Sequence, residues 1–115
     1  MSLLPVQPIQ PIQPIQVKVF KSPKEQETGV LKEPSPLPNR LVYFFPNINQ
    51  DSIFHTYGLK EKILIVYLDF LFQIIDLKIL EPNEITMPPR NTKHAVELSI
   101  TAPRILNYEA LKSYL

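Results

Sequence analysis

Polar and apolar residues alternate strictly at residues 96–101. This period of two predicts a β-strand, because successive side chains of a strand point to opposite faces of a sheet. Residues 41–45 are aromatic and β-branched, and Pro46 with two asparagines follows them, which predicts a second strand that ends in a turn. Residues 52–57 form a weaker strand candidate that stops at Gly58.

Residues 59–80 contain no glycine, proline or asparagine, and their pattern leaves two interpretations open. As a helix, the segment would place Lys62, Asp69, Gln73 and Asp76 on a narrow polar stripe. As strands, it would present one fully apolar face. The length favours a helix, whereas the many Ile, Val and Phe residues and the clean alternation at residues 76–79 favour strands. We favour strands and keep the helix as the alternative.

The remaining elements are short. Residues 81–84 predict a turn, residues 88–91 predict a loop, and the apolar residues after Arg104 have helical spacing to the end of the chain. The fold class that this pattern predicts is α+β: a small β-rich domain at residues 41–115 with a short C-terminal helix. This domain has more apolar surface than 75 residues can cover, which indicates an oligomeric or partner interface.

A repeat of period three fills residues 5–16, which are Pro-Val-Gln followed by three copies of Pro-Ile-Gln. Proline every third residue excludes a helix and predicts polyproline II, the left-handed extended backbone with three residues per turn. Proline, aliphatic residue and glutamine then occupy three separate edges. The aliphatic edge would be exposed in an isolated arm, so we expect it to bind another protein surface.

The segment that follows the repeat, residues 17–20, alternates like a strand and could add to a sheet edge. The partner-binding residues predicted for this arm are Pro5, Val6, Pro8, Ile9, Pro11, Ile12, Pro14, Ile15, Val17, Val19 and Phe20. Residues 21–40 are proline-rich and of mixed charge, which predicts a linker. We therefore divide the chain into an extended proline-rich N-terminal arm and linker at residues 1–40 and a domain at residues 41–115.

The composition, net charge and apolar stretches of the chain limit the classes of protein to which it can belong. The chain has 115 residues, 44% of them hydrophobic, with 13 prolines and no cysteine, so a small domain lacks the disulfides that often stabilise such folds. Twelve basic and eleven acidic residues give a net charge of +1, which does not favour nucleic acid as a partner. No signal peptide is recognisable, and the longest apolar stretch, residues 63–75, is too short to span a bilayer. We expect a soluble location.

Candidate chemistry is sparse. His55 and His94 lie in no metal-ligand spacing, and Asp69 and Asp76 more simply mark a polar surface than a pair of catalytic carboxylates. Neither a glycine-rich phosphate loop nor a nucleophile elbow occurs. We therefore predict no catalytic residues, no metal site, no cofactor and no enzymatic activity.

These observations favour a non-catalytic structural subunit of a large protein assembly, such as a virion, in which the arm lies along neighbouring subunits of a homo- or hetero-oligomer. Two alternatives remain open. The arm could be the ligand of a polyproline-reading domain, which would make the protein an adaptor. Residues 59–80 could instead form an interfacial helix of a peripheral membrane protein, although their two aspartates count against this.

Overall fold

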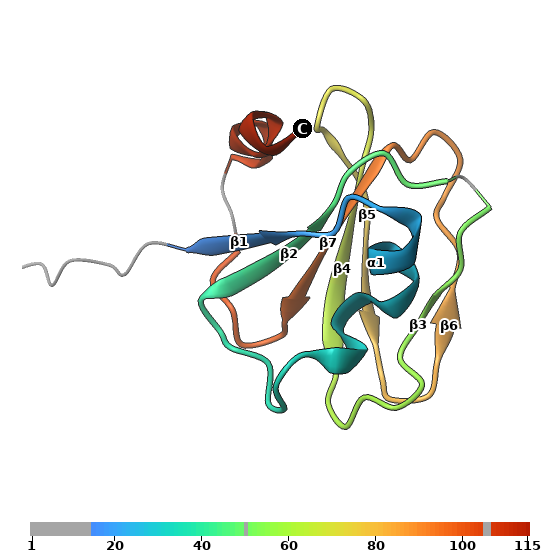
Figure 1. The fold of residues 1–115 in the computed structure, drawn as a ribbon. Coiled ribbons are helices and arrows are strands. Elements are labelled where there is room, and N and C mark those ends of the chain that lie inside the picture. The colour runs from blue at the N-terminus through green and yellow to red at the C-terminus, as the bar shows by residue number, and fades with distance from the viewer. Residues whose placement is uncertain (1–14, 50, 105–106) are drawn as a thin grey trace, which may run out of the picture.

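Five strands form the main sheet of the computed structural model, which describes residues 15–49, 51–104 and 107–115 (Figure 1). The order across the sheet is β1-β2-β7-β4-β5, with β1 parallel to β2 and every other neighbouring pair antiparallel. The strands are β1 (Gln16–Val19), β2 (Leu41–Phe45), β4 (Ile63–Leu68), β5 (Ile74–Leu80) and β7 (His94–Ser99). The chain is thus a small, mostly β domain, as the sequence predicted.

The other elements are short. Strands β3 (Phe54–His55) and β6 (Ile85–Thr86) pair with each other in a second, two-stranded sheet. The helical elements are α1 (Pro23–Thr28) and the 3-10 helices η1 (Gly29–Lys32) and η2 (Tyr108–Tyr114). In Figure 1, α1 and the β3–β6 pair lie at the opposite end of the molecule from η2.

The main sheet buries apolar side chains on both sides. On face A, the side under α1, η1 and β3, a core forms around Phe20, Val30, Tyr43, Phe45, Phe54 and Tyr67. On face B, which η2 covers, a second core forms around Val42, Phe44, Leu64, Val66, Phe72 and Leu111. Every residue of β4 and β7 is buried, because these two strands lie inside the sheet and are covered on both faces.

Residues 59–80 form two strands, β4 and β5, so the favoured interpretation is confirmed and the helical alternative is wrong. The membrane hypothesis that required an interfacial helix there loses its structural basis. The chain reverses without glycine or proline because the Asp69 carboxylate accepts hydrogen bonds from the N–H groups of Leu71 and Gln73, both at 2.9 Å. Phe72 completes the turn with a φ of +62°.

Other predicted elements are confirmed with shifted bounds. The strand predicted at residues 41–45 is β2, and the one predicted at residues 96–101 is β7, which begins and ends two residues earlier. The weak candidate at residues 52–57 contains the short β3. The C-terminal helix is present as the 3-10 helix η2, whose first turn is capped by Asn107, since its side chain accepts the Glu109 N–H at 3.0 Å.

Residues 15–40 differ most from expectation. Residues 17–20 do add to a sheet edge, but to the edge of the chain's own sheet, beside β2. Residues 21–40, predicted as a linker, contain α1 and η1, and Phe20, Val30 and Leu37 are buried in the face A core. These three apolar residues hold a polar, proline-rich segment on the sheet. Residues 1–14 lie outside the described residues.

Candidate functional site

The predicted partner-binding residues divide into two groups. Those from Pro5 to Pro14 lie outside the described residues, so the structure does not place them. Ile15, Val17 and Val19 are partly buried against the face B core, and Phe20 is buried in the face A core. The described end of the arm therefore directs its apolar side chains into its own domain.

Face A contains a cavity of about 420 Å³ between the sheet, α1, η1 and the loop that precedes β3. Its apolar wall comes from Val30, Phe45, Ile48 and Phe54, all of which are core residues. Polar residues also line it, namely Lys21, Gln26, Glu27, Thr28, Asn47, Asn49, Ser52, His55 and Glu97. An apolar cavity with a few polar groups is the usual form of a small-molecule site.

Glu97 is the polar residue of this cavity that belongs to the central strand β7. Its side chain is buried, with 4% exposure, and its Oε2 atom accepts no hydrogen bond from the described residues. Burial raises the pKa of the Glu97 carboxyl to about 8. The carboxyl is therefore mostly protonated at pH 7, and it can donate one hydrogen bond or, once ionised, pair with a cation.

The aromatic neighbour of Glu97 is Tyr43, its cross-strand partner on β2. The Tyr43 hydroxyl is also buried, and it too has no hydrogen-bond partner among residues 15–49, 51–104 and 107–115. Burial, together with the charges of nearby glutamates including Glu97, raises the pKa of Tyr43 to about 12. The Tyr67 hydroxyl of β4 is likewise buried without a hydrogen-bond partner in the described part of the chain, so β2, β7 and β4 each place an unpaired polar group on face A.

Helix α1 covers the cavity and is fixed by its own capping. The Ser22 hydroxyl accepts the Glu25 N–H at 3.0 Å, and the Glu25 carboxylate accepts the Ser22 N–H at 3.0 Å, which completes a capping box. Gln26 then donates to the carbonyl oxygens of Phe20 and Pro46, at 2.9 and 2.8 Å. Gly29, at the joint with η1, has a φ of +54° that favours glycine.

The two histidines lie apart. His55 is on β3 and lines the cavity on face A, whereas His94 is the first residue of β7 and packs on face B between Phe44 and Phe72. His94 Nδ1 accepts the Asn47 N–H at 3.0 Å, which requires that nitrogen to be unprotonated. Burial, with the adjacent Lys93, lowers the pKa of His94 to about 4.

The carboxylates of Asp69 and Asp76 do not form a pair, because each accepts hydrogen bonds from a different backbone segment. Asp69 holds the turn between β4 and β5, and Asp76 Oδ1 accepts the Leu77 N–H at 2.8 Å on strand β5. No group of three or more potential metal ligands occurs among the described residues. No described helix is both long and apolar enough to cross a membrane.

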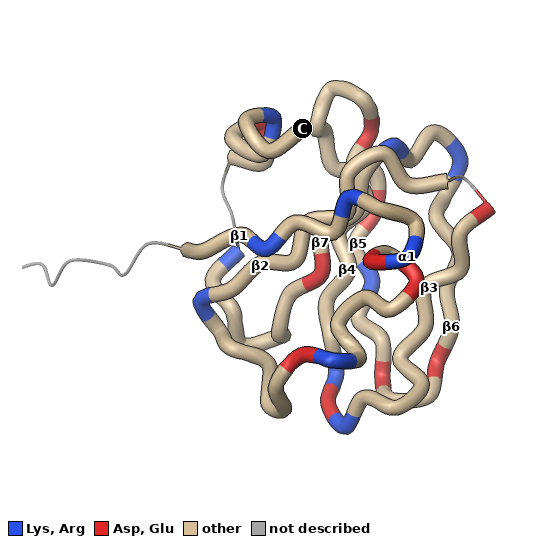
Figure 2. The backbone as a smooth tube through the Cα atoms, in the orientation of Figure 1, with Lys and Arg blue, Asp and Glu red and all other residues tan. Residues whose placement is uncertain are grey.

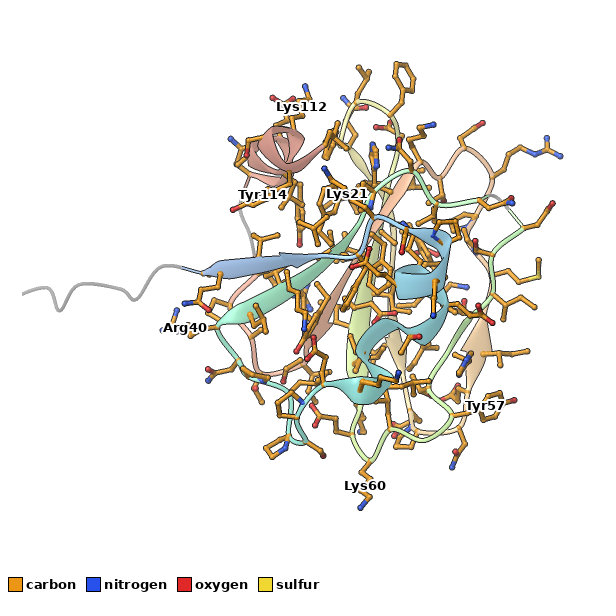
Figure 3. All side chains as sticks on the ribbon, viewed as in Figure 1. Lys21, Arg40, Tyr57, Lys60, Lys112 and Tyr114 are labelled. Carbon is orange, nitrogen blue, oxygen red and sulfur yellow. The ribbon has the colours of Figure 1, made fainter. Side chains whose placement is uncertain are left out.

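Charged side chains are dispersed over the described surface. Figure 2 shows basic and acidic residues interspersed along loops and strand ends. In Figure 3, Arg40, Lys60 and Lys112 point outward at three separate corners of the molecule. These cations do not form one stripe.

Face B continues beyond its buried core onto an exposed aliphatic surface at β5. Ile74, Leu77 and Ile79 lie opposite the buried residues Leu68, Val66 and Leu64 of β4, and so on the same face of the sheet. Their exposed fractions are 51%, 40% and 58%. We call these three residues the β5 surface. Strand β5 is an outer strand of the sheet, bonded only to β4.

The sequence pattern did not identify Glu97 as a site residue. Alternation of polar and apolar residues is typical of a strand with one face in solvent, and such a strand has its polar side chains exposed. Glu97 is buried because β7 lies inside the sheet and both of its faces are covered in this fold. The sequence alone does not give the position of a strand within its sheet.

No family model matches the chain, and no curated protein matches it. Two solved structures are similar in fold. A protein of unknown function from Novosphingobium aromaticivorans DSM 12444 has a TM-score of 0.61 at 11% sequence identity over 72% of this chain and 61% of its own. A candidate transcription regulator from Sinorhizobium meliloti 1021 has a TM-score of 0.61 at 12% identity over 72% of this chain and 67% of its own.

At these identities the likeness concerns the fold alone. The chain spans less than two thirds of the length of the Novosphingobium protein.

Proposed function

We propose that this protein is a non-catalytic structural subunit of a larger protein assembly, such as a virion, and that it binds neighbouring subunits through the β5 surface and its N-terminal arm. The observation that supports this most directly is the β5 surface. Three aliphatic side chains stand in a row on an outer strand, in continuity with a buried core. Continuous exposed apolar patches mark interaction sites more often than isolated exposed residues do.

A partner that covers the β5 surface would gain an appreciable free energy of binding. Complete burial of an aliphatic side chain contributes roughly 1.5–3 kcal/mol, and about half of each β5 side chain is still exposed, so a partner would gain roughly 1 kcal/mol per residue. Phe70 and Leu71, exposed at 71% and 47% in the adjoining turn, would enlarge the contact. An outer strand also offers backbone groups to an added extended segment.

The N-terminal repeat is the occupant that best fits this surface. Its aliphatic edge carries Val6, Ile9 and Ile12, and its last member, Ile15, packs on face B. Strands β1 and β5 are at opposite edges of the sheet. An arm that leaves one subunit at β1 and binds β5 of the next subunit would therefore make a head-to-tail contact, the type that builds rings and filaments.

The test is the native mass of the purified full-length chain and of three variants, measured across a range of protein concentrations. We expect the full-length chain to associate, and we expect both deletion of residues 1–14 and Ile79→Lys to give monomers. Ile85→Lys is the matched control, since Ile85 is 54% exposed but belongs to the separate β3–β6 sheet. A full-length chain that stays monomeric, or a deletion that leaves the association unchanged, contradicts the proposal.

A further inference from the structure

The carboxyl of Glu97 is an unusual group to find at the centre of a small sheet. Strand β7 lies between β2 and β4, so Glu97 has a strand on each side and a covered face above it. An ionised carboxylate in such a place requires a counter-ion or several hydrogen bonds, because burial removes its hydration.

No cation of the described chain neutralises this carboxyl. The two ion pairs among those residues join Lys18 to Glu33 and Lys62 to Glu81. Lys21 lines the same cavity but forms neither a hydrogen bond nor an ion pair with Glu97 among the interactions of the described residues. Glu97 therefore lines the cavity with a carboxyl whose Oε2 atom is shielded from solvent and accepts no hydrogen bond from the described residues.

The cavity has the form that complements an amphipathic ligand. Its volume of about 420 Å³ falls in the lower part of the range for small-molecule sites, roughly 300–1,000 Å³. Val30, Phe45 and Phe54 supply apolar and aromatic walls, and aromatic faces attract cations as well as apolar groups. One buried carboxyl among such walls selects for a positive charge attached to an apolar body.

We propose that this cavity binds a small organic cation, an ammonium or guanidinium group on an apolar body, and that Glu97 is its counter-ion. The cation enters between α1 and the loop before β3, and its apolar part lies against Phe45 and Phe54. The ligand is either a free amine or the side chain of a lysine or arginine from another protein, since both present the same chemistry.

Binding of this kind is coupled to a proton. The Glu97 pKa of about 8 means that the free protein must release one proton before the carboxylate can pair with a cation below that pH. The apparent affinity should then rise about tenfold per pH unit below pH 8 and level off above it. The other ionisable residues that line this space are Lys21, which precedes α1, Glu27 of α1 and His55 of β3. Tyr43 of β2 and Tyr67 of β4 do not line it, but the charge of Glu97 raises the pKa of both.

The experiment uses the full-length chain and pairs of probes matched in shape. Butylammonium and benzylammonium are compared with butanol and benzyl alcohol by calorimetric titration at several pH values, and amide chemical shifts of α1 and β7 locate the contact. Butylguanidinium and capped lysine amide test the two sources of the cation. Binding of the small amines but not of the capped lysine would assign the site to free amines.

The key variant is Glu97→Gln. The glutamine amide is nearly isosteric with the protonated carboxyl, so we expect this variant to fold. We expect it to bind the cations at least roughly tenfold more weakly and without the pH slope, since a charge-assisted hydrogen bond is lost. Glu27→Gln and His55→Gln are the matched controls, because both residues line the same cavity, and we expect each to keep the slope. Failure of the wild-type chain to bind either amine overturns the proposal. So does equal binding of the alcohols, or a pH slope that survives in Glu97→Gln.

Discussion

Face A and face B of the main sheet are covered by different elements and to different extents. Face A is covered by a segment with few apolar residues, α1 with η1, and it keeps a cavity, a buried carboxyl and two tyrosine hydroxyls without hydrogen-bond partners among the described residues. Face B has a mainly apolar core that also contains His94, and η2 covers it, but this cover ends before β5, where aliphatic side chains stay exposed. An imperfect cover thus produces an internal cavity on one face and an external patch on the other.

The difference indicates two kinds of recognition. A buried polar group that lines a cavity of limited volume suits a small ligand. A row of aliphatic residues on an outer strand suits a protein segment, which can pair with the strand and cover the row. One sheet can therefore support a ligand site and a protein contact that share no residues.

The largest expected effect comes from two adjacent phenylalanines that point to opposite faces. Phe44→Ala and Phe45→Ala should each lower the free energy of unfolding by about 3–5 kcal/mol, because both side chains are fully buried. Phe45 borders the cavity, so water or neighbouring side chains can fill its space, and its loss should be the smaller of the two. Urea titration measures both values. The reverse order would mean that face B is the looser core.

The next largest effect is the pH dependence of the free energy of unfolding. It depends on two buried ionisable residues of β7, one on each face of the sheet. Glu97 has a folded pKa of about 8 against an ordinary value of 4.5, so its stabilisation is complete below pH 4.5 and is lost as the pH rises to 8. His94 has a folded pKa of about 4 against 6.5, so its stabilisation is complete above pH 6.5 and is lost as the pH falls to 4.

The two contributions oppose each other between pH 4.5 and 6.5, and Glu97 acts alone above that range. The free energy of unfolding should therefore fall by about 2 kcal/mol between pH 6.5 and 8, at roughly 1.4 kcal/mol per pH unit. Glu97→Gln should remove this fall, whereas His94→Gln should extend it down to about pH 5. Denaturant titrations at half-unit pH intervals test both. A fall above pH 6.5 that persists in Glu97→Gln would assign it to another group.

The smallest effect concerns the cover of face A. Ser22→Ala removes the hydroxyl that accepts the Glu25 N–H and should lower the free energy of unfolding by about 1 kcal/mol. Because α1 also covers the cavity, its amides should exchange hydrogen faster in this variant while those of η2 stay unchanged. Hydrogen exchange followed by NMR measures the two helices separately. Equal acceleration in both would indicate general loosening rather than a local change in face A.

Much of the sheet follows from local patterns. A short aromatic and β-branched run identifies β2 and strict alternation identifies β7, because those signals depend only on the residues of each strand, whereas the pattern around β4 only favoured strands over a helix. The turn at Asp69 was harder to predict, since it uses a carboxylate to cap backbone groups and a phenylalanine at positive φ instead of glycine. Side-chain capping of this kind depends on the geometry of the turn, and many aspartates outside turns have the same neighbours.

The candidate site was harder to predict from the sequence than the strands were. Segment 21–40 has the composition of a linker, and only its tertiary contacts through Val30 and Leu37 make it a cover for face A. The cavity exists because that cover is incomplete, and Glu97 is buried because β7 is central. Both conditions depend on the order of strands in the sheet, which a single sequence does not specify.

That strand order also has a kinetic consequence. Strand β7 joins β2 to β4, yet it follows all the other strands in the sequence. Until β7 has been synthesised, β1 with β2 and β4 with β5 are only two separate pairs of strands, and isolated pairs are marginally stable. Until late in synthesis, β2 and β4 of the nascent chain therefore each lack the partner on their β7 side. Folding is dominated by contacts of large sequence separation, which form slowly. For such a chain, the interval before β7 forms is when aggregation competes most strongly with folding.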